Sequence, residues 1–376
     1  MGYAPRHLLT VLHAAERTGP PLLALRFLRW LREQRPSWQL TTLFLDADGP
    51  LAEDFAELGP TLFEEPPNPE RDRLPWLAGG MRERRLARTL ARLGAVDVAH
   101  VHCAGSMRVV PLLPRAPILC HVHELSVGQD FHLGSVARKE LPRATRYVAV
   151  SDAVRDELLA RFAVDPARVE RQWGFVDPRM LPDRTRPLPR LAPAGSTVVV
   201  GSGVRHWRKG PELFVRVAQR CRELHPEHDW RFVWIGGTDH GGLEALVERA
   251  GLHDVVAFLP HQDDPLSWIA AADIFFLSAR EDAFPLVSVE AAALGRPLVS
   301  FDSGGTPELI AAAGCGRTVP FPQVDTAAHQ LAALASDDEE RDALGDAGAR
   351  FAQRHLVVEA AGPALLSAIE ATMGSS

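Results

Sequence analysis

The sequence predicts an α/β protein with two domains, each built on a parallel β-sheet covered by helices. Its 376 residues are enough for two or three domains. Short apolar runs that suit buried strands alternate with longer segments that begin next to Gly or Pro, which is the pattern of strand–helix repeats. Near the middle, Asp177–Pro193 is rich in Pro and Arg and lacks apolar periodicity, so we interpret this stretch as an interdomain linker.

The first half of the chain begins with a strand, followed by a loop that ends at Gly19-Pro20-Pro21 and a helix at Leu22–Leu31. Asp46 and Asp48 form a D-x-D pattern, but the Gly-Pro pair that follows them favours a turn, so we expect no metal there. The strands that we expect in this half are His7–Leu12, Leu40–Leu45, Asp97–His102 and Pro117–His123.

Two of these strands end in an H-x-H pattern, His100 with His102 and His121 with His123. Strand alternation puts both members of each pair on one face of the sheet, and the carboxyl ends of such strands normally line a cleft. Four histidines could bind a metal, but we favour hydrogen-bonded histidines over zinc.

A second α/β domain begins at Thr197–Val200, which leads into Gly201-Ser202-Gly203. The dinucleotide pattern G-x-G-x-x-G is broken because His206 stands at the third Gly position. The next strand, Arg231–Ile235, ends in Gly236-Gly237 and lacks the acidic residue that binds a ribose in that fold. The sequence therefore disfavours a dinucleotide-dependent oxidoreductase.

Two further strands, Ile274–Leu277 and Arg296–Phe301, are each followed by a short loop and a helix. Pro285 fits the first position of one helix and Gly295 its end, and Thr306 is the expected N-cap of the other. Adjacent junctions of this kind direct unpaired backbone N–H groups at one crevice, which attracts phosphate.

Glu290 is the exceptional residue of this segment. Its helical neighbours are apolar, and a buried carboxylate is costly without partners. Sugar hydroxyls would satisfy it by donating hydrogen bonds, and a local backbone group or an Arg would do so equally well. Asp282 stands eight positions earlier, so we expect it at the mouth of the same crevice.

The segment S-x-R-E-D-x-F-P-L-V-x-x-E-A, with G-R-P-L-V and G-G-T-P-E downstream, resembles the signature of the family-4 glycosyltransferases. These are retaining enzymes of the GT-B fold, in which two Rossmann-like domains face each other across a cleft. The usual pair is Glu-x7-Glu; here Asp282 takes the first position, and the adjacent Glu281 is the alternative. The resemblance implies an acceptor-binding domain at 1–180, a linker at 181–194, a nucleotide-sugar-binding domain at 195–350 and a helical segment at 351–376 that crosses back.

The resemblance also implies which residues bind the donor. In W-R-K-G, Lys209 matches the Lys that holds the donor diphosphate, and Arg205 or Arg208 would be its partner. The other donor-binding positions that it implies are Gly19, Gly203, Gly236, Phe284, Pro285, Leu286, Val287 and Gly305.

In the same way, Asp282 is expected to bind hydroxyls of the donor sugar and Glu290 those of the ribose. His123 matches a His that the family places near the donor sugar, so Lys209, Asp282 and His123 form the expected catalytic set. The donor would be a UDP- or GDP-sugar, acting as a co-substrate, with no cofactor and no metal required. Alternatives are a nucleotide-sugar epimerase, a sugar phosphorylase or a non-catalytic nucleotide-sugar-binding protein.

Composition bounds the partners and the location of the chain. A net charge of −7 does not favour binding to nucleic acid. The four cysteines are widely spaced and indicate neither a zinc site nor a set of disulfide bonds. No apolar run is long enough for a signal peptide or a membrane span, so we expect a cytoplasmic enzyme with a small-molecule, glycan or lipid-linked acceptor. Two Arg-rich helices could contact a membrane or a phosphorylated acceptor, or could simply be solvated: Arg26, Arg29, Arg32 and Arg35, and Arg82, Arg84, Arg85, Arg88 and Arg92.

Overall fold

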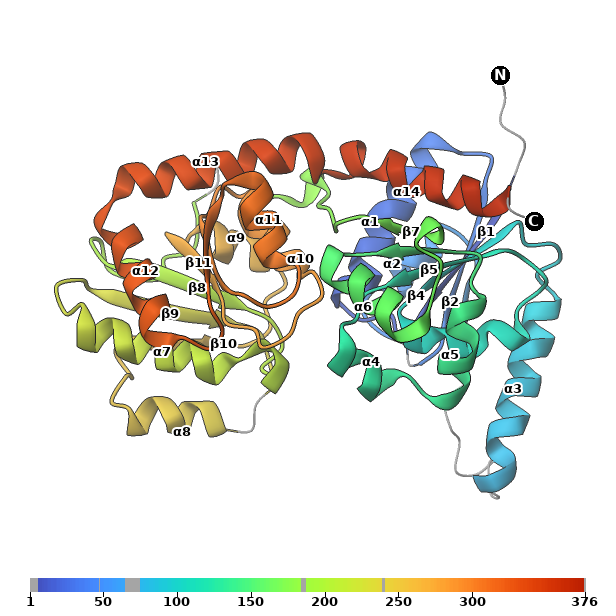
Figure 1. Ribbon diagram of the computed structural model, residues 1–376, viewed down its shortest axis with the longest axis horizontal. Coiled ribbons are helices and arrows are strands. Elements are labelled where there is room, and N and C mark those ends of the chain that lie inside the picture. The colour runs from blue at the N-terminus through green and yellow to red at the C-terminus, as the bar shows by residue number, and fades with distance from the viewer. Residues whose placement is uncertain (1–5, 47, 65–74, 184–186, 239–240, 375–376) are drawn as a thin grey trace. The chain divides into compact units, whose positions relative to one another are not determined.

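The computed structural model describes residues 6–46, 48–64, 75–183, 187–238 and 241–374. The chain divides into two compact units, Met1–Trp173 together with Ala361–Ser376, and Gly174–Ala360. Each unit contains one parallel sheet with helices on it (Figure 1). By this division the segment 181–194, which we expected as a linker, belongs to the second unit.

The first unit is built on a seven-stranded sheet in the order β3-β2-β1-β4-β5-β6-β7, with every neighbouring pair parallel. The strand order reverses between β1 and β4, so ligands are expected at the carboxyl ends of these two strands. The strands are β1 (His7–Leu12), β2 (Gln39–Phe44), β3 (Thr61–Phe63), β4 (Val98–His102), β5 (Ile118–Val122), β6 (Arg146–Ala149) and β7 (Val169–Arg171).

The helices of this unit begin with α1 (Gly19–Gln34), whose apolar face is buried. We expected Gly19 to Pro21 to lie in a loop, but they form the first turn of α1, because Pro lacks the N–H that this turn leaves unpaired. The other helices are α2 (Ala52–Ala56), α3 (Pro75–Ala91), α4 (Ser126–His132), α5 (Ser135–Glu140) and α6 (Asp152–Phe162), with short 3₁₀ segments at Ala104–Leu112, Leu141–Arg143 and Pro166–Arg168.

The end of the chain returns to the first unit through α14 (Val358–Met373). A side chain on Gly362 would meet the ring of Trp30 on α1 at 3.0 Å, so the two helices pack closely there. Gln172 Nε2 donates to the carbonyl oxygen of Ala361 at 2.8 Å, and Arg35 lies 3.5 Å from Glu370.

The second unit has a six-stranded parallel sheet in the order β10-β9-β8-β11-β12-β13. Here the order reverses between β8 and β11. The strands are β8 (Thr197–Ser202), β9 (Trp230–Ile235), β10 (Val256–Leu259), β11 (Ile274–Leu277), β12 (Leu298–Phe301) and β13 (Gly316–Val319). The helices are α7 (Pro211–Leu224), α8 (Gly242–Arg249), α9 (Pro265–Ala270), α10 (Leu286–Ala293), α11 (Thr306–Ala313), α12 (Val324–Ser336) and α13 (Asp338–His355), with 3₁₀ segments at Pro178–Met180 and Trp207–Lys209.

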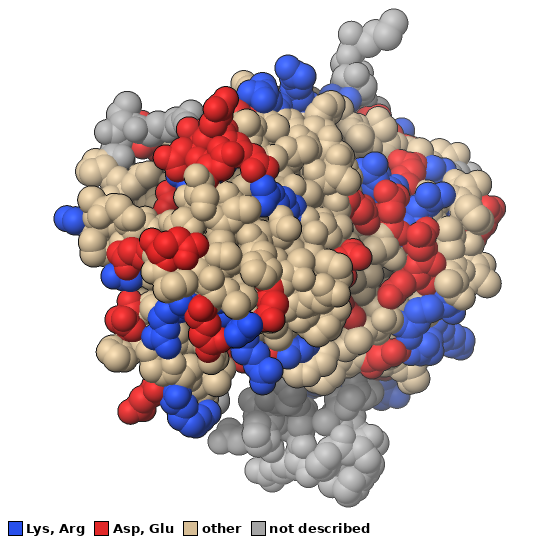
Figure 2. Space-filling view, turned by 60° about the vertical axis from the view of Figure 1, so that its left-hand side comes forward, with Lys and Arg blue, Asp and Glu red and all other residues tan. Residues whose placement is uncertain are grey.

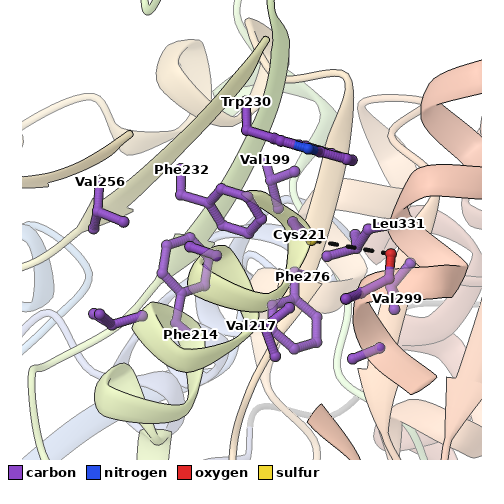
Figure 3. Packing of buried hydrophobic residues seen from close by; sticks show 14 of the residues in the cluster. Val199, Phe214, Val217, Cys221, Trp230, Phe232, Val256, Phe276, Val299 and Leu331 are labelled. Carbon is purple, nitrogen blue, oxygen red and sulfur yellow. Dashed lines mark hydrogen bonds between the residues drawn. The ribbon is translucent and has the colours of Figure 1, made fainter. Parts of the chain in front are cut away.

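The core of the second unit combines aromatic and aliphatic side chains (Figure 3). Phe214 of α7 lies edge-on against Phe232 of β9, with ring centroids 5.2 Å apart, and stacks on Phe276 of β11 at 6.0 Å. Val299 of β12 and Leu331 of α12 belong to the same cluster. This packing holds α7 against the sheet, and therefore restrains the loop that precedes α7.

Charged side chains of both signs are interspersed on the face shown in Figure 2, in keeping with the net charge of −7. The arginines of α1 contact protein groups: Arg29 pairs with Asp54, and Arg32 donates to the carbonyl oxygen of Leu58. Every helix in the described part of the chain is too short or too polar to span a lipid bilayer.

Candidate active site

The candidate site of the second unit lies where strand order reverses, at the carboxyl ends of β8 and β11. Ser278 follows β11, and its hydroxyl donates to the carbonyl oxygens of Gly210 at 2.8 Å and Lys209 at 3.2 Å. Gly210 has a left-handed φ of 64°, and a Cβ there would come within 2.2 Å of the Ser278 carbonyl oxygen. The loop before α7 can therefore approach β11 this closely only with glycine at position 210.

Lys209 and Asp282, which are 73 residues apart, form an ion pair at this point. The ammonium group of Lys209 donates to Asp282 Oδ2, and the exposed fractions of the two side chains are 21% and 11%. Gly203 has φ 144°, and a Cβ there would lie 3.5 Å from the Lys209 side chain. The structure thus brings together the Lys and the first acid of the motif, beside the Gly203 turn.

The two strand-to-helix junctions expected from the sequence are joined to each other. The backbone N–H of Gly305 donates to the carbonyl oxygen of Asp282 at 3.4 Å, and Ser303 Oγ donates to that of Arg280 at 2.6 Å. Ser288 of α10 and Thr306 of α11 share a buried hydrogen bond of 3.0 Å between their hydroxyls. The N-termini of α10 and α11 are therefore held side by side.

Two helix starts differ from the prediction by one residue. Pro285 is the N-cap of α10, with φ −67° and ψ 123°, so α10 begins at Leu286. Gly305 is the N-cap of α11, and Thr306 is its first residue. Thr306 does not cap α11, because its hydroxyl bonds to Ser288 instead.

The two arginines that could accompany Lys209 have different surroundings. The guanidinium of Arg205 donates to the carbonyl oxygens of Gly236 at 2.8 Å and Leu259 at 3.1 Å, and pairs with Glu244 at 2.7 Å. It also lies 4.8 Å from the centre of the Phe258 ring. The guanidinium of Arg208 makes no hydrogen bond or ion pair with another described residue, and the side chain is half-buried. Arg208 is therefore the one available to a ligand.

The other expected donor-binding positions surround this junction. Glu290 lies on α10 and is 9% exposed, and Phe284 is 8% exposed. Gly236 has φ 142°, and a Cβ there would lie 2.1 Å from the carbonyl oxygen of Gly203, so two glycine turns pack against each other. Pro285 and Gly305 are buried, whereas Leu286 and Val287 are half-buried.

In the first unit, His123 follows β5 and lies among the other histidines. Its Nε2 is 3.1 Å from Nδ1 of His102, and Nε2 of His100 is 3.3 Å from Nδ1 of His121. Burial lowers the pKa of His100 and of His123 to about 3 and that of His102 and His121 well below the ordinary value. The prediction that these rings share one sheet face is confirmed.

The carboxylate of Glu124 accepts the backbone N–H groups of Ala104 at 3.1 Å and His123 at 3.0 Å. It therefore orders the ends of β4 and β5. Gly19 begins α1, and a Cβ built there meets no described atom within 4 Å, so the start of α1 is open. Ser278 had no predicted role of its own, although it opens the S-x-R-E-D motif.

Comparisons with known proteins agree with this architecture. Residues 23–179 match the family described as Glycosyltransferase Family 4, and residues 189–351 match Glycosyl transferases group 1. HepE of Anabaena in complex with UDP-glucose superimposes with a TM-score of 0.78 at 16% identity, over 97% of this chain and 99% of that one. Sucrose-phosphate synthase of Thermosynechococcus elongatus superimposes with a TM-score of 0.79 at 17% identity, over 99% of this chain and 100% of that one. The fold is GT-B.

Curated relatives include D-inositol 3-phosphate glycosyltransferases. That of Kribbella flavida is 29% identical over an aligned length of 294, and the match covers 71% of this chain and 69% of the relative. That of Corynebacterium kroppenstedtii is 29% identical over an aligned length of 265, and the match covers 64% of this chain and 59% of the relative. The chain belongs to the family-4 glycosyltransferases and is a glycosyltransferase of the GT-B type.

Proposed function

We propose that this enzyme transfers a hexosyl group from a UDP- or GDP-sugar to an acceptor hydroxyl, with retention of configuration at the anomeric carbon. The observation that supports this most directly is the Lys209–Asp282 pair at the reversal point of the second sheet, beside the N-termini of α10 and α11. A cation, a carboxylate and unpaired backbone N–H groups are the groups that a diphosphate linked to a sugar requires.

Lys209 and Arg208 are proposed to bind the diphosphate and to stabilise the charge that grows on it as the glycosidic bond breaks. Donor binding would draw the ammonium of Lys209 towards phosphate oxygens, and Asp282 would then accept hydrogen bonds from hydroxyls of the sugar. Arg205 is given a structural role, because its donors already bond to carbonyl oxygens and to Glu244. No metal is needed to neutralise the diphosphate in this scheme.

Glu290 is proposed to bind the ribose hydroxyls. It is buried on α10, whose start is joined through Ser288 to the start of α11. A carboxylate that accepts two vicinal hydroxyls forms charge-assisted hydrogen bonds, which are stronger than bonds between neutral groups. His123 is proposed to contact the donor sugar from the first unit, and Gly19 to leave space for the ligand at the start of α1.

The acceptor class is the open part of the assignment. The relatives named D-inositol 3-phosphate glycosyltransferase make a phosphorylated polyol the first acceptor to test, before glycans and lipid-linked acceptors. Arg84, Arg88 and Arg92 of the α3 region are exposed and suit a phosphorylated or membrane-bound acceptor. Sedimentation with vesicles that contain or lack anionic lipid tests whether these arginines bind a membrane. Binding that does not depend on anionic lipid would contradict this role of the arginines.

The experiment that tests the function is a thermal-shift screen against UDP-, GDP-, ADP- and dTDP-sugars, followed by product analysis with the donor that stabilises the protein. Transfer to an acceptor with the donor's anomeric configuration supports the proposal. Epimerisation of the donor without an acceptor would identify an epimerase, and consumption of inorganic phosphate would identify a phosphorylase. Donor binding without transfer or hydrolysis would leave a binding protein.

A further inference from the structure

Four of the histidines in the first unit are arranged as two diagonal pairs across the neighbouring strands β4 and β5. In the sheet register, His102 of β4 lies opposite His121 of β5, yet its ring bonds to His123, two residues further on. His100 bonds to His121 with the same offset. The rings of His102 and His123 are stacked, with centroids 5.2 Å apart and planes 16° apart. We call this arrangement of His100, His102, His121 and His123 the histidine ladder.

The rings of the ladder are neutral near pH 7, because burial lowers the pKa of each one. In a neutral imidazole one nitrogen carries a hydrogen and donates, while the other accepts. The contact of 3.1 Å between His102 Nδ1 and His123 Nε2 can therefore be made in two ways. Which way it is made decides what His123 offers to a ligand.

The second nitrogen of His102 distinguishes the two arrangements. His102 is 1% exposed, and its Nε2 is buried without a hydrogen-bond partner in the described part of the chain. If His123 donated from Nε2, His102 would have to carry its hydrogen on Nε2, as a buried N–H without an acceptor. Buried orphan N–H groups are rarer than under-satisfied acceptors. The favoured form has the hydrogen of His102 on Nδ1, pointing to His123.

This result fixes the tautomer of the next ring. If His123 accepts at Nε2, its own hydrogen must lie on Nδ1. His123 is half-buried, and its Nδ1 makes no hydrogen bond with another described residue. The same reasoning does not decide the His100–His121 pair, because both outer nitrogens, His100 Nδ1 and His121 Nε2, lack a described partner.

We infer that His102 is a positioning residue, which holds His123 as the Nδ1–H tautomer so that His123 donates a hydrogen bond to an oxygen of the bound sugar and does not act as a base. This inference rests on the proposed function for the identity of the ligand, a sugar hydroxyl or ring oxygen. The tautomer itself can be measured without any ligand.

A metal ion is the competing occupant of the ladder. One ring nitrogen from each of His100, His102 and His121 lies within 4.8 Å of the others. A tetrahedral zinc ion with bonds of about 2.0–2.1 Å would hold its nitrogen ligands roughly 3.3–3.4 Å apart, so the rings would have to move inward. Each bound ring would also need an acceptor for its other N–H, and the outer nitrogens of the ladder have none among the described residues.

The first test is ¹⁵N NMR of protein labelled at histidine, free of ligand. In the intact protein we expect His123 with protonated Nδ1 and unprotonated Nε2. His102→Leu should convert His123 to a mixture of tautomers, whereas His102→Asn, whose amide can place an N–H near the Nδ1 position, should retain the Nδ1–H form. A wild-type His123 protonated at Nε2 would overturn the inference, as would stoichiometric zinc binding that shifts the signals of the ladder.

The second test is kinetic and uses the donor identified in the thermal-shift screen. His102→Leu should lower kcat/KM for the donor about ten-fold, the value of one hydrogen bond, and His102→Asn should restore most of it. The pH profile of the wild type should show no limb from His123 between pH 5.5 and 8, because the ring stays neutral throughout this range and donates its Nδ1–H without losing it. A limb that His123→Asn abolishes would overturn the inference. If no sugar transfer is found but the tautomer is as expected, the proposed function fails and His102 still positions His123.

Discussion

The histidine ladder should make the first unit sensitive to acid. His100 on β4 is 1% exposed. Its ring is surrounded by the rings of His102 on the same strand, His121 on β5 and Phe27 on α1. Burial lowers its pKa from 6.5 to about 3. Between these values the unfolded chain binds a proton at His100 that the folded chain does not bind. The free energy of unfolding is therefore not reduced by His100 above pH 6.5, and it decreases as the pH falls towards 3.

The size of the effect follows from the pKa shift. At pH 5, which is about 1.5 units below the pKa of the unfolded chain, His100 alone lowers the free energy of unfolding by about 2 kcal/mol, at about 1.4 kcal/mol per unit. His102 and His121 act in the same direction, because burial lowers their pKa first and neighbouring histidines lower it further. Their shares are coupled to that of His100, so the single-residue figure is the one to test.

The assay is urea denaturation at pH 7 and pH 5, with hydrogen exchange of β4 and β5 peptides as the measure for the first unit. His100→Phe removes the titrating group, so the loss of stability from pH 7 to pH 5 should be about 2 kcal/mol smaller than in the wild type. Leu119→Ala is the matched control, because Leu119 is the buried register partner of His100 on β5. This substitution should lower the free energy of unfolding by the same amount at both pH values. An unchanged pH dependence in His100→Phe would refute the reasoning.

Three further predictions concern the second unit. Lys209→Ala should weaken binding of the matching nucleoside diphosphate about ten-fold or more by calorimetry, while Arg216→Ala, on the outer face of α7, should not; equal affinities would remove Lys209 from the diphosphate site. Glu290→Gln should reduce kcat/KM for the donor roughly 10- to 100-fold with an unchanged melting temperature, and wild-type kinetics would contradict the ribose assignment. Gly210→Ala should destabilise the protein by at least about 1 kcal/mol in urea, because φ is 64° and the Ser278 carbonyl oxygen would lie 2.2 Å from the new Cβ; unchanged stability would show that the loop can move.

Much of the fold could be predicted because buried parallel strands leave a strong local signal. The run Ile274–Leu277 was predicted with the bounds that the structure gives to β11. Strands β3, β7, β10 and β13 were not predicted, because each has only three or four residues and none is fully buried. A strand of this length leaves no detectable alternation and depends on its neighbour for its conformation.

The site was predictable as a set of residues but not as a set of contacts. The motif identified Lys209 and Asp282, yet their pairing depends on the turn at Gly210 and on the Ser278 hydroxyl that holds it. Sequence position also left Arg205 and Arg208 equivalent. Only the tertiary surroundings distinguish them, because Arg205 donates to the carbonyl oxygens of Gly236, directly after β9, and of Leu259, the last residue of β10.

The pairing of Lys209 with Asp282 has a consequence for which ligand the site prefers. On the proposed roles, Lys209 and Asp282 neutralise each other before the donor arrives, so a diphosphate must compete with a carboxylate for the ammonium group. A nucleoside diphosphate alone would break the pair and leave Asp282 without a partner, at 11% exposure of its side chain. A complete donor would compensate by offering sugar hydroxyls to the released acid. The ion pair would therefore favour the intact nucleotide sugar over the nucleotide product, and Asp282→Asn should reduce that preference by strengthening product binding relative to donor binding.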